Sequence, residues 1–537
     1  MSDIFALMRL ILRRDRVRLP VWILCLVVFL YLMVPVIQQS LGGPGTLHDL
    51  YLQFIANPAI RFLVGPMDSP SFGAAFTIKT LLWWGIAAAI MNILLVVRHT
   101  RANEETGTQE ILLSTRVRRG ADLVAVLNVS AIANLVIAVG IGGALSLSTH
   151  EITAEQGWLF GVGIGLTGFL WAVMTGLIAQ MVSSARGAYG VAAFLVGIAF
   201  VLRGVGDFFG TVSSSGVPKA QWVSFLSPFG WLQATHPLTY PDWMPLWLFI
   251  VASLIVLPAA LWLVAHRDAG SGYFPVRAGS SRATRLGRTS FGLTLVLHRM
   301  IWLCWTLGVV ALMSVIGAIA PSMTMVYSSS DVLKRIIQTL GGTGAVRTVF
   351  FSAMLTIAVF MILAYAIQAI GLLHSEEASG HLDALLATSL GRWEWYSLHL
   401  AVVSLGSTLA LVLSGLVLGG AADLEGGYSQ TGDYLVGALS YLPLILVFIA
   451  GYGLFFGLLP RMARAVVWAY FTYVVGYAWL GALLRVPNWV SILTPLHYIS
   501  AAPAQPVRIL PGLLLLIVAG TFFVVGGVTW RQRDVGR

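Results

Sequence analysis

The chain has 537 residues, of which 58% are hydrophobic and only 10% carry a charge. Soluble globular chains carry about 25% charged residues, so this composition, with a mean hydropathy of +0.86, excludes that class. The formal net charge is +10. In so apolar a chain, excess base is typical of cytoplasmic loops, and the placement of the arginines favours loops over nucleic-acid binding. The composition predicts an all-α polytopic membrane protein.

Twelve apolar stretches could each form a spanning helix, which needs about 20 mostly apolar residues. The basic stretch MSDIFALMRLILRRDRVR precedes the first of them. No small-residue cleavage site follows, so we expect an uncleaved first span rather than a signal peptide. The expected spans of the first half lie at about 19–37, 74–97, 121–147, 157–182, 188–209 and 244–265. Those of the second half lie at about 301–320, 349–373, 398–420, 434–459, 465–484 and 509–529.

The charges orient these spans. If the N-terminus is cytoplasmic, most of the 32 basic residues fall in cytoplasmic segments, from Arg13 through Arg118 and Arg288 to Arg531. Acids such as Glu151 fall on the opposite side. The positive-inside rule therefore predicts that both termini are cytoplasmic.

Two stretches half a chain apart resemble each other: NEETGTQEILLSTRVRR at 103–119 and EEASGHLDALLATSLGR at 376–392. The aligned pairs are Glu104 with Glu377, Gly107 with Gly380, Glu110 with Asp383, Leu112 with Leu385 and Leu113 with Leu386. A second pair is WVSFLSPFGW at 222–231 and WVSILTPLHY at 489–498. We therefore expect one six-helix unit used twice. Because each unit has an even number of spans, the repeats are expected to be parallel, related by an axis along the membrane normal.

This repeat predicts three segments. The first six-helix half covers 1–265, an Arg- and Gly-rich cytoplasmic linker covers 266–290, and the second half covers 291–537. An amphipathic basic stretch, at 5–14 and again at 291–299, is expected to form an elbow helix before the first span of each half.

The acidic stretch lies in a short expected cytoplasmic loop of each half and has two interpretations. Thr106 with Gln109 resembles a capping box, and a short helix from about 108 to 115 would follow it. Acids at a helix N-terminus are favoured by the helix dipole, so ordinary capping explains one copy. The second copy keeps the acid, glycine, acid and Leu-Leu pattern, which favours a pair of docking surfaces.

Several chemistries have no support in the residues. No phosphate-binding G-x-x-x-x-G-K-[ST] loop is present, and the only lysines are Lys79, Lys219 and Lys334. His374 and His381 flank acids, but their first-half equivalents are Arg101 and Thr108, which argues against a paired metal site. Cys25 and Cys304 lie in apolar runs and indicate packing rather than a disulfide or metal site. We expect no catalytic site, no metal and no nucleic-acid partner.

The stretch FVLRGVGDFF carries the main ionisable pair expected within a span. Arg203 and Asp207 are four residues apart, which places them on one helix face toward the outer side. They could be an interfacial pair whose side chains snorkel toward water, a polar element of an outer gate, or part of a proton relay.

These residues together resemble a known family. The EE-x-G-x-x-E-x-L-L-x-T loop, the LRGVGD stretch, SPFGW and its partner ILTPLHY are similar to the duplicated twelve-span ABC-2-type permeases of actinobacteria, described as tetronasin-type exporters of polyketide antibiotics. The resemblance covers nearly the whole chain. It implies a transmembrane permease of the bacterial cell membrane that exports hydrophobic or amphiphilic, drug-like compounds through a path between its halves.

The resemblance also implies partners and site residues. Two copies of a separately encoded ATPase, which would carry ATP and Mg, are expected to dock on two coupling helices in contact with the cytoplasm. The coupling residues implied are Glu104, Glu105, Gly107, Glu110, Leu112, Leu113, Glu376, Glu377, Gly380, Asp383, Leu385 and Leu386. The candidate outer gate comprises Arg203, Asp207, Pro228, Trp231, Pro495 and His497. The second loop has one more residue between its acids and its glycine, so the two loops are expected to couple unequally.

Two other functions remain open from the sequence. A proton-driven multidrug antiporter would use the same duplicated spans, but it needs ionisable groups near the bilayer middle, and the expected spans hold few. A lipid-handling membrane scaffold would need no such groups and no motor.

Overall fold

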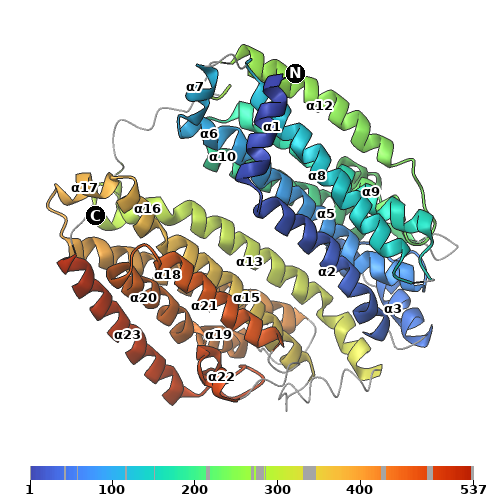
Figure 1. The fold of residues 1–537 in the computed structure, drawn as a ribbon. Coiled ribbons are helices and arrows are strands. Elements are labelled where there is room, and N and C mark those ends of the chain that lie inside the picture. Colours follow the sequence, from blue (N-terminus) through green and yellow to red (C-terminus); the bar gives the residue numbers. More distant parts are fainter. Residues whose placement is uncertain are drawn as a thin grey trace. The chain divides into compact units, whose positions relative to one another are not determined.

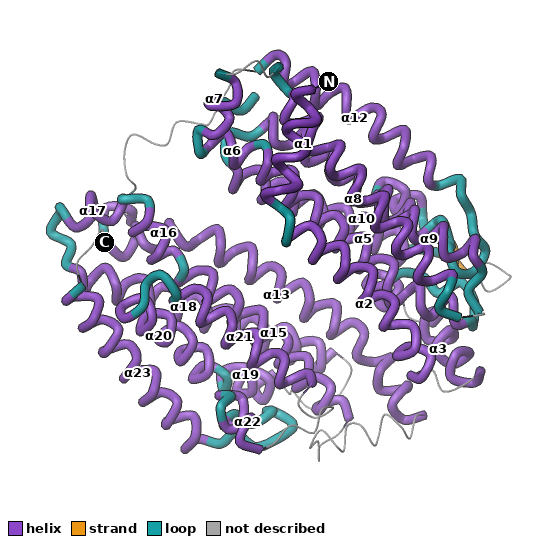
Figure 2. The backbone as a smooth tube through the Cα atoms, viewed as in Figure 1, coloured by secondary structure: helices purple, strands orange, loops and turns teal. Residues whose placement is uncertain are grey.

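The computed structural model describes residues 2–40, 44–56, 58–114, 118–149, 151–212, 218–267, 271–273, 284, 286–329, 346–424, 431–480 and 488–533. It divides into two compact units, Met1–Gly279 and Ser280–Arg537. Most described residues are helical (Figures 1 and 2). One short antiparallel pair, β1 (Thr211–Val212) with β2 (Pro218–Lys219), lies in the first unit.

The helices of the first unit follow the expected order, with short helices added between the long ones. They are α1 (Ser2–Arg14), α2 (Arg18–Ser40), α3 (Pro44–Ala56), α4 (Pro58–Val64), α5 (Phe72–His99), α6 (Arg101–Glu105), α7 (Thr108–Leu113), α8 (Ala121–Ser146), α9 (Ala154–Met181), α10 (Ala185–Phe208), the 3₁₀ helix η1 (Trp222–Leu226), α11 (Pro228–Gln233) and α12 (Leu246–His266).

The second unit contains a similar succession. Its helices are η2 (Leu286–Arg288), α13 (Ser290–Ser329), α15 (Val346–Ile370), α16 (Leu372–Ala378), α17 (His381–Leu386), α18 (Arg392–Leu424), α19 (Thr431–Leu439), α20 (Leu442–Leu458), α21 (Ala463–Leu480), α22 (Asn488–Ile492), η3 (Pro495–Tyr498) and α23 (Ile509–Gln532).

Eleven stretches of the described chain are helical, long and apolar enough to cross a membrane, which confirms a polytopic helical membrane protein. Eleven of the twelve expected spans correspond to them. The exception is the expected span at 465–484, where α21 begins at Ala463 and does not reach that standard. Residues 481–484 lie outside the described residues.

Polar residues fix where several spans begin. Ser71 accepts a hydrogen bond from the backbone N–H of Ala74 and caps α5. Thr153 and Gln156 form a capping box at the start of α9, and Ser184 caps α10 through the N–H of Gly187. Such side chains satisfy N–H groups that the first turn of a helix leaves without partners.

The structure differs from the expected helix boundaries at two places. The elbow expected at 291–299 is not a separate helix, because α13 runs without a break from Ser290 to Ser329. In the first unit α1 and α2 are indeed distinct. The span expected at 434–459 is present as Thr431–Leu458, but it contains a short turn between α19 and α20, where Pro443 stands in the first turn of α20. Proline is accepted there because its missing N–H would have no intrahelical partner.

The fourth long helix is central to the packing of the first unit. α9 packs against α5, α8 and α12. Gly161 and Gly165 of α9 lie so close to α8 that an added Cβ would fall 2.3 Å from the carbonyl oxygen of Ala138 and 2.8 Å from that of Asn134, respectively. Small residues permit this approach between membrane helices, where lipid supplies no hydrophobic drive for association.

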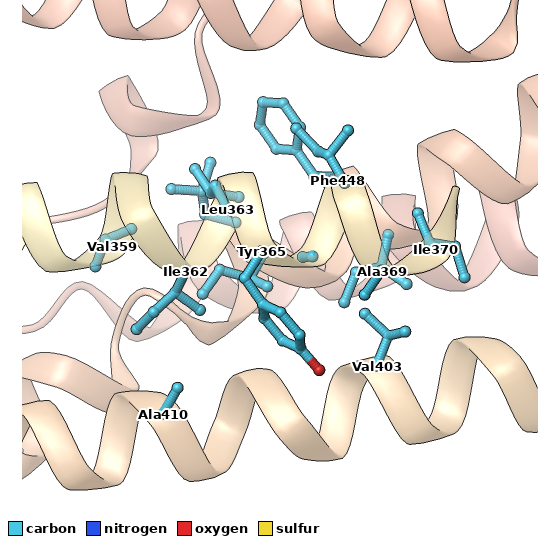
Figure 3. Close-up of a cluster of buried hydrophobic side chains, with 14 of the residues drawn as sticks. Val359, Ile362, Leu363, Tyr365, Ala369, Ile370, Val403, Ala410 and Phe448 are labelled. Atoms are coloured by element: carbon cyan, nitrogen blue, oxygen red, sulfur yellow. The ribbon is translucent and has the colours of Figure 1, made fainter. Parts of the chain in front are cut away.

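The second unit is packed in the same order. α20 contacts α15, α18 and α23, and α15 also lies against α13 and α18. Figure 3 shows Tyr365 extending from α15 toward the helix that carries Val403 and Ala410. The Tyr365 hydroxyl occupies the space above Gly406 of α18, where an added Cβ would be 2.3 Å away. The core is therefore shaped by specific contacts between a large and a small residue.

Candidate functional site

Each unit carries a pair of short helices at one end of its bundle. The first loop (residues 101–114) contains α6 and α7, between α5 and α8. The second loop (residues 372–388) contains α16 and α17, between α15 and α18. Within the first unit α6 and α7 lie at the end where α1 is found (Figure 1), and Arg14 of α1 donates a 3.0 Å hydrogen bond to Asn103.

Glu104 of the first loop points into the protein. Its side chain is only 5% exposed, and it forms ion pairs with Arg101 and with Arg267, which directly follows α12. Arg267 Nη1 lies 2.9 Å from Glu104 Oε2. Burial of charged side chains is tolerated when they are paired and share hydrogen bonds, as these three do.

Arg267 joins three parts of the first unit. Its Nε donates to Gln180 Oε1 at 2.8 Å, near the end of α9, and its Nη1 also donates to the carbonyl oxygen of Ser271 at 2.5 Å. Arg101 donates to the same carbonyl at 3.1 Å. The first loop is therefore tied to the ends of the fourth and sixth long helices of its unit.

The second loop has the corresponding ion pair. Arg533, directly after α23, pairs with Glu377, and its Nη1 donates to the carbonyl oxygen of Phe456 near the end of α20 at 2.8 Å. Its guanidinium also lies over the rings of Phe456 and Trp530, at 5.1 and 4.8 Å from their centroids. This pair is less buried, with side chains 18% and 16% exposed.

The aligned glycines also have the same conformation. Gly107 and Gly380 have φ angles of +70° and +74°, the left-handed region that favours glycine. Each stands between the two short helices of its loop. In both units, therefore, a glycine with left-handed backbone geometry stands between two acids of the loop. The acid before the glycine, Glu104 or Glu377, pairs with the arginine that follows the last long helix. The acid after the glycine is Glu110 or Asp383.

The capping box expected in the first loop does not form. The hydroxyl of Thr106 donates back to the carbonyl oxygens of Ala102 and Asn103, at the end of α6. Gln109 Nε2 instead donates to Asp122 Oδ2 of α8 at 3.0 Å. The tertiary contact with α8 replaces the local contact that the sequence spacing suggested.

The exposed members of the expected coupling set are fewer than the sequence suggested. Glu110 and Asp383 are exposed. Ile111, which was not in that set, lies next to Glu110 in the chain and is 71% exposed. Glu105 is exposed, although its Oε1 accepts a 2.8 Å hydrogen bond from the N–H of Ala185 at the start of α10. Glu376 Oε2 lies 3.6 Å from His381 Nδ1. Leu385 and Leu386 are half-buried against the core, and the side chains of Leu112 and Leu113 lie outside the described residues.

The expected outer ion pair is buried rather than snorkelling. Arg203 is 0% exposed and donates to Asp207 Oδ2 at 3.0 Å. It also donates to the carbonyl oxygens of Phe62, at 2.6 Å, and of Leu63, at 3.2 Å. These carbonyls belong to the last turn of α4, which has no intrahelical donors for them. Arg203 thus caps α4 from within the bundle, so the snorkelling interpretation is wrong.

The remaining candidate gate residues lie at matching places in the two units. Pro228 and Pro495 are buried at the starts of α11 and η3. Trp231 donates through Nε1 to the carbonyl oxygen of Phe225 at 2.6 Å, whereas His497 is exposed and lies against Tyr498. These residues therefore belong to the turns at α11 and η3. The Arg203–Asp207 pair lies in the first unit.

Sequence reasoning missed the arginines that hold the loops. Arg267 and Arg533 were interpreted only as orienting charges after the last span of each half, although each directly follows that span. Because both arginines directly follow the last span of their half, their matching positions in the repeat could have pointed to a shared role. It also missed Asp15, which binds Arg98 at 2.6 Å and His99 at 2.5 Å beside the first loop. Among the described residues, no group of three or more His, Cys, Asp or Glu side chains could hold a metal.

The apolar helices, together with the similarity to an efflux permease described next, define a multi-pass protein of the cell membrane, as predicted. A family model described as "Multidrug efflux system permease Rv1217c, C-terminal domain" matches residues 7–264 and 288–531. A relative from Mycobacterium tuberculosis (strain ATCC 25618 / H37Rv), the multidrug efflux system permease protein Rv1217c, is 31% identical over 541 residues, which cover 98% of this chain and 94% of that protein. The chain belongs to this permease family. Its finer resemblance to ABC-2-type exporters stays a prediction.

Proposed function

We propose that this chain is the membrane permease of an efflux system that exports hydrophobic or amphiphilic compounds, and that separately encoded ATPase subunits drive it. Its family and its matched relative are both described as multidrug efflux permeases. The chain would hydrolyse no ATP itself. ATP and Mg would be bound by two ATPase copies, one at each loop, and the chain would perform no enzymatic step.

The ion pair made in both units carries this proposal. Glu104 with Arg267, and Glu377 with Arg533, fasten each loop to the end of the last long helix. A force applied to a loop held in this way is transmitted to the helices rather than absorbed by a mobile connection. Such a link suits the alternating access that rigid movement of helix bundles produces.

The geometry divides the expected coupling residues by role. Glu104 and Glu377 hold their loops to the bundle, so they are positioning residues. Glu110 and Asp383 stand beyond the left-handed glycines with exposed side chains. We infer that these two acids, with Ile111, contact the ATPase.

The test is charge reversal of the two exposed acids together. The variant Glu110→Lys/Asp383→Lys is purified from its native cells with the ATPase that accompanies the wild-type chain. We expect normal insertion and thermal stability but a reduced yield of bound ATPase. Efflux should fall roughly tenfold or more, since the loss of about 1.4 kcal/mol of binding free energy weakens an affinity tenfold. The control is Glu151→Lys, which reverses an exposed acid between α8 and α9, at the other end of the unit. Wild-type efflux by the double variant would contradict the docking role.

A further inference from the structure

A cavity of about 370 Å³ lies in the first unit, at the end of the bundle away from the first loop. It is enclosed by the residues after α4, the first turns of α5, the end of α10, and α11 with the residues that follow it. This volume is in the range of small-molecule sites. The cavity therefore has the size of a binding site, and its walls determine what it could hold.

One wall is apolar. Val64, Ile78, Leu81, Leu82 and Phe225 supply the apolar side chains that line the cavity. Leu81 and Leu82 are each 1% exposed, so this wall is fixed by the packing of α5. A ligand with an apolar body would be stabilised here by removal of that body from water.

The cavity is also lined by three residues with acceptor oxygens that lack donors. Asp68 Oδ1, Asp207 Oδ1 and Gln233 Oε1 are buried, and none has a hydrogen-bond partner among the described residues. All three residues line the cavity. Asp68 and Asp207 are 9% and 2% exposed. A buried acceptor without a donor costs free energy, so three in one cavity indicate a missing donor group.

The second oxygen of each carboxylate is already held. His236 Nδ1 lies 2.7 Å from Asp68 Oδ2, and Arg203 Nη1 lies 3.0 Å from Asp207 Oδ2. These contacts fix the carboxylates with their free oxygens unpaired. Burial and the neighbouring Asp68 raise the pKa of Tyr240, so its hydroxyl stays protonated beside that carboxylate.

The two nearby arginines do not line the cavity, and His236, which does, is held by Asp68. The guanidinium of Arg203 is directed to the α4 carbonyls, and Arg61, also buried, is not among the lining residues. The lining therefore includes three acceptor oxygens without a donor, two of them on carboxylates, and this arrangement suits a cation that carries N–H donors. A primary ammonium has three such donors.

The second unit has no equivalent arrangement in the described residues. Its cavity beside η3, of about 390 Å³, is lined almost wholly by apolar and aromatic side chains, including Phe448, Phe455 and Tyr498. Aligning the two WVS stretches places Tyr470 opposite Arg203 and the buried Val474 opposite Asp207. The group of acceptors without donors is therefore a feature of the first unit.

We propose that this cavity binds the ammonium end of a cationic amphiphile and that this amphiphile is cargo of the permease. The ammonium donates to Asp68, Asp207 and Gln233, while the apolar body lies against Leu81 and Leu82. The description as cargo rests on the proposed efflux function. The binding itself does not.

The experiment measures binding to the full chain in nanodiscs of zwitterionic phosphatidylcholine, without nucleotide or ATPase. The probe is tritiated 1-adamantylammonium, and empty nanodiscs correct for partition into lipid. The competitors are unlabelled 1-adamantylammonium, adamantan-1-ol and adamantane-1-carboxylate, which share one apolar body. We expect saturable binding that the carboxylate does not displace and that the alcohol displaces roughly tenfold more weakly than the ammonium, because it lacks the charge and two donors.

Two variants and a control locate the binding. Asp68→Asn removes one acceptor charge and should weaken binding roughly tenfold or more. Leu81→Trp leaves all three acceptors in place but fills the cavity, so it should abolish binding even if Asp68→Asn folds poorly. Glu151→Gln neutralises an exposed acid at the same end and should bind as the wild type does.

Three results would overturn the proposal: no saturable binding to the folded wild-type chain, equal displacement by the carboxylate, or wild-type affinity in both cavity variants. Efflux of the same probe from cells tests the proposed function separately. Binding without efflux would leave the site standing and refute its cargo role, whereas efflux without binding would refute the site alone.

Discussion

At the scale of single residues, the acids of the two loops have different roles that their spacing did not separate. Glu104 is buried between two arginines, whereas Glu110, six residues later, is exposed. Both were expected on one docking surface. A carboxylate that is paired with two buried guanidinium groups contributes to stability first, because its removal leaves both positive charges without their partner in a poorly hydrated place.

Neutralising Glu104 should therefore destabilise the chain. We expect Glu104→Gln to cost about 3 kcal/mol, since Arg101 and Arg267 lose their partner while buried. Glu377→Gln should cost less because the Glu377–Arg533 pair is more exposed. The measurement is thermal unfolding of the detergent-purified variants, with the exposed Glu110→Gln as control. Equal stability of Glu104→Gln and Glu110→Gln would contradict the buried pair.

The left-handed glycines give a second prediction at this scale. Gly107→Ala and Gly380→Ala should each destabilise by about 1–2 kcal/mol, the cost of a Cβ in this backbone region. Apart from the adjoining residues, no atom of the described chain lies within 4 Å of either added Cβ, so the cost is conformational and not a clash. Gly143→Ala in α8 is the control: it also has open space but helical geometry, and alanine should be neutral or stabilising there. Loss of stability only in Gly143→Ala would refute this explanation.

At the scale of elements, helix positions followed from the sequence more closely than helix breaks. The apolar runs placed the spans, and the loop helix expected at about 108–115 is α7, Thr108–Leu113. The fused α13 and the break between α19 and α20 were not anticipated. A basic residue such as Arg299 does not end a helix, so charge patterning alone could not locate a boundary.

The contact between Tyr365 of α15 and Gly406 of α18 can be tested with two substitutions. Gly406→Ala should destabilise by about 1–3 kcal/mol, since its Cβ would meet the Tyr365 hydroxyl at 2.3 Å and Trp302 at 2.8 Å. Adding Tyr365→Phe removes that hydroxyl and should recover part of the loss. Gly420→Ala, on the same helix with open space around it, should have little effect. Thermal unfolding distinguishes these cases, and an unrescued double variant would show that the hydroxyl is not the obstacle.

At the scale of the whole molecule, two units of similar succession each present one loop fastened to a last long helix. The proposed export function assigns the energy source to a partner that contacts those loops. The alternative, a proton-driven antiporter, needs carboxylates that can gain and lose protons within the spans. Asp207, the acid at the end of α10, is held by Arg203.

Transport should therefore depend on ATP and not on a proton gradient. In inside-out vesicles that contain the permease with its ATPase, we expect uptake of substrate on addition of Mg-ATP and no loss when a protonophore is added. The control is a vesicle with a catalytically inactive ATPase. Uptake driven by a pH gradient without ATP would favour the antiporter.

The sequence by itself determined the class of molecule, the positions of most spans and the two matching loops. Composition and hydropathy are sums over the chain, and helical spans satisfy their own backbone groups, so neither needs tertiary information. Only the tertiary structure decided which acid is buried, that Arg267 and Arg533 hold the loops, and that Arg203 caps α4. It also brought Asp68, Asp207 and Gln233 around one cavity. These contacts join residues far apart in the chain, and no local periodicity encodes which distant partner a side chain will meet.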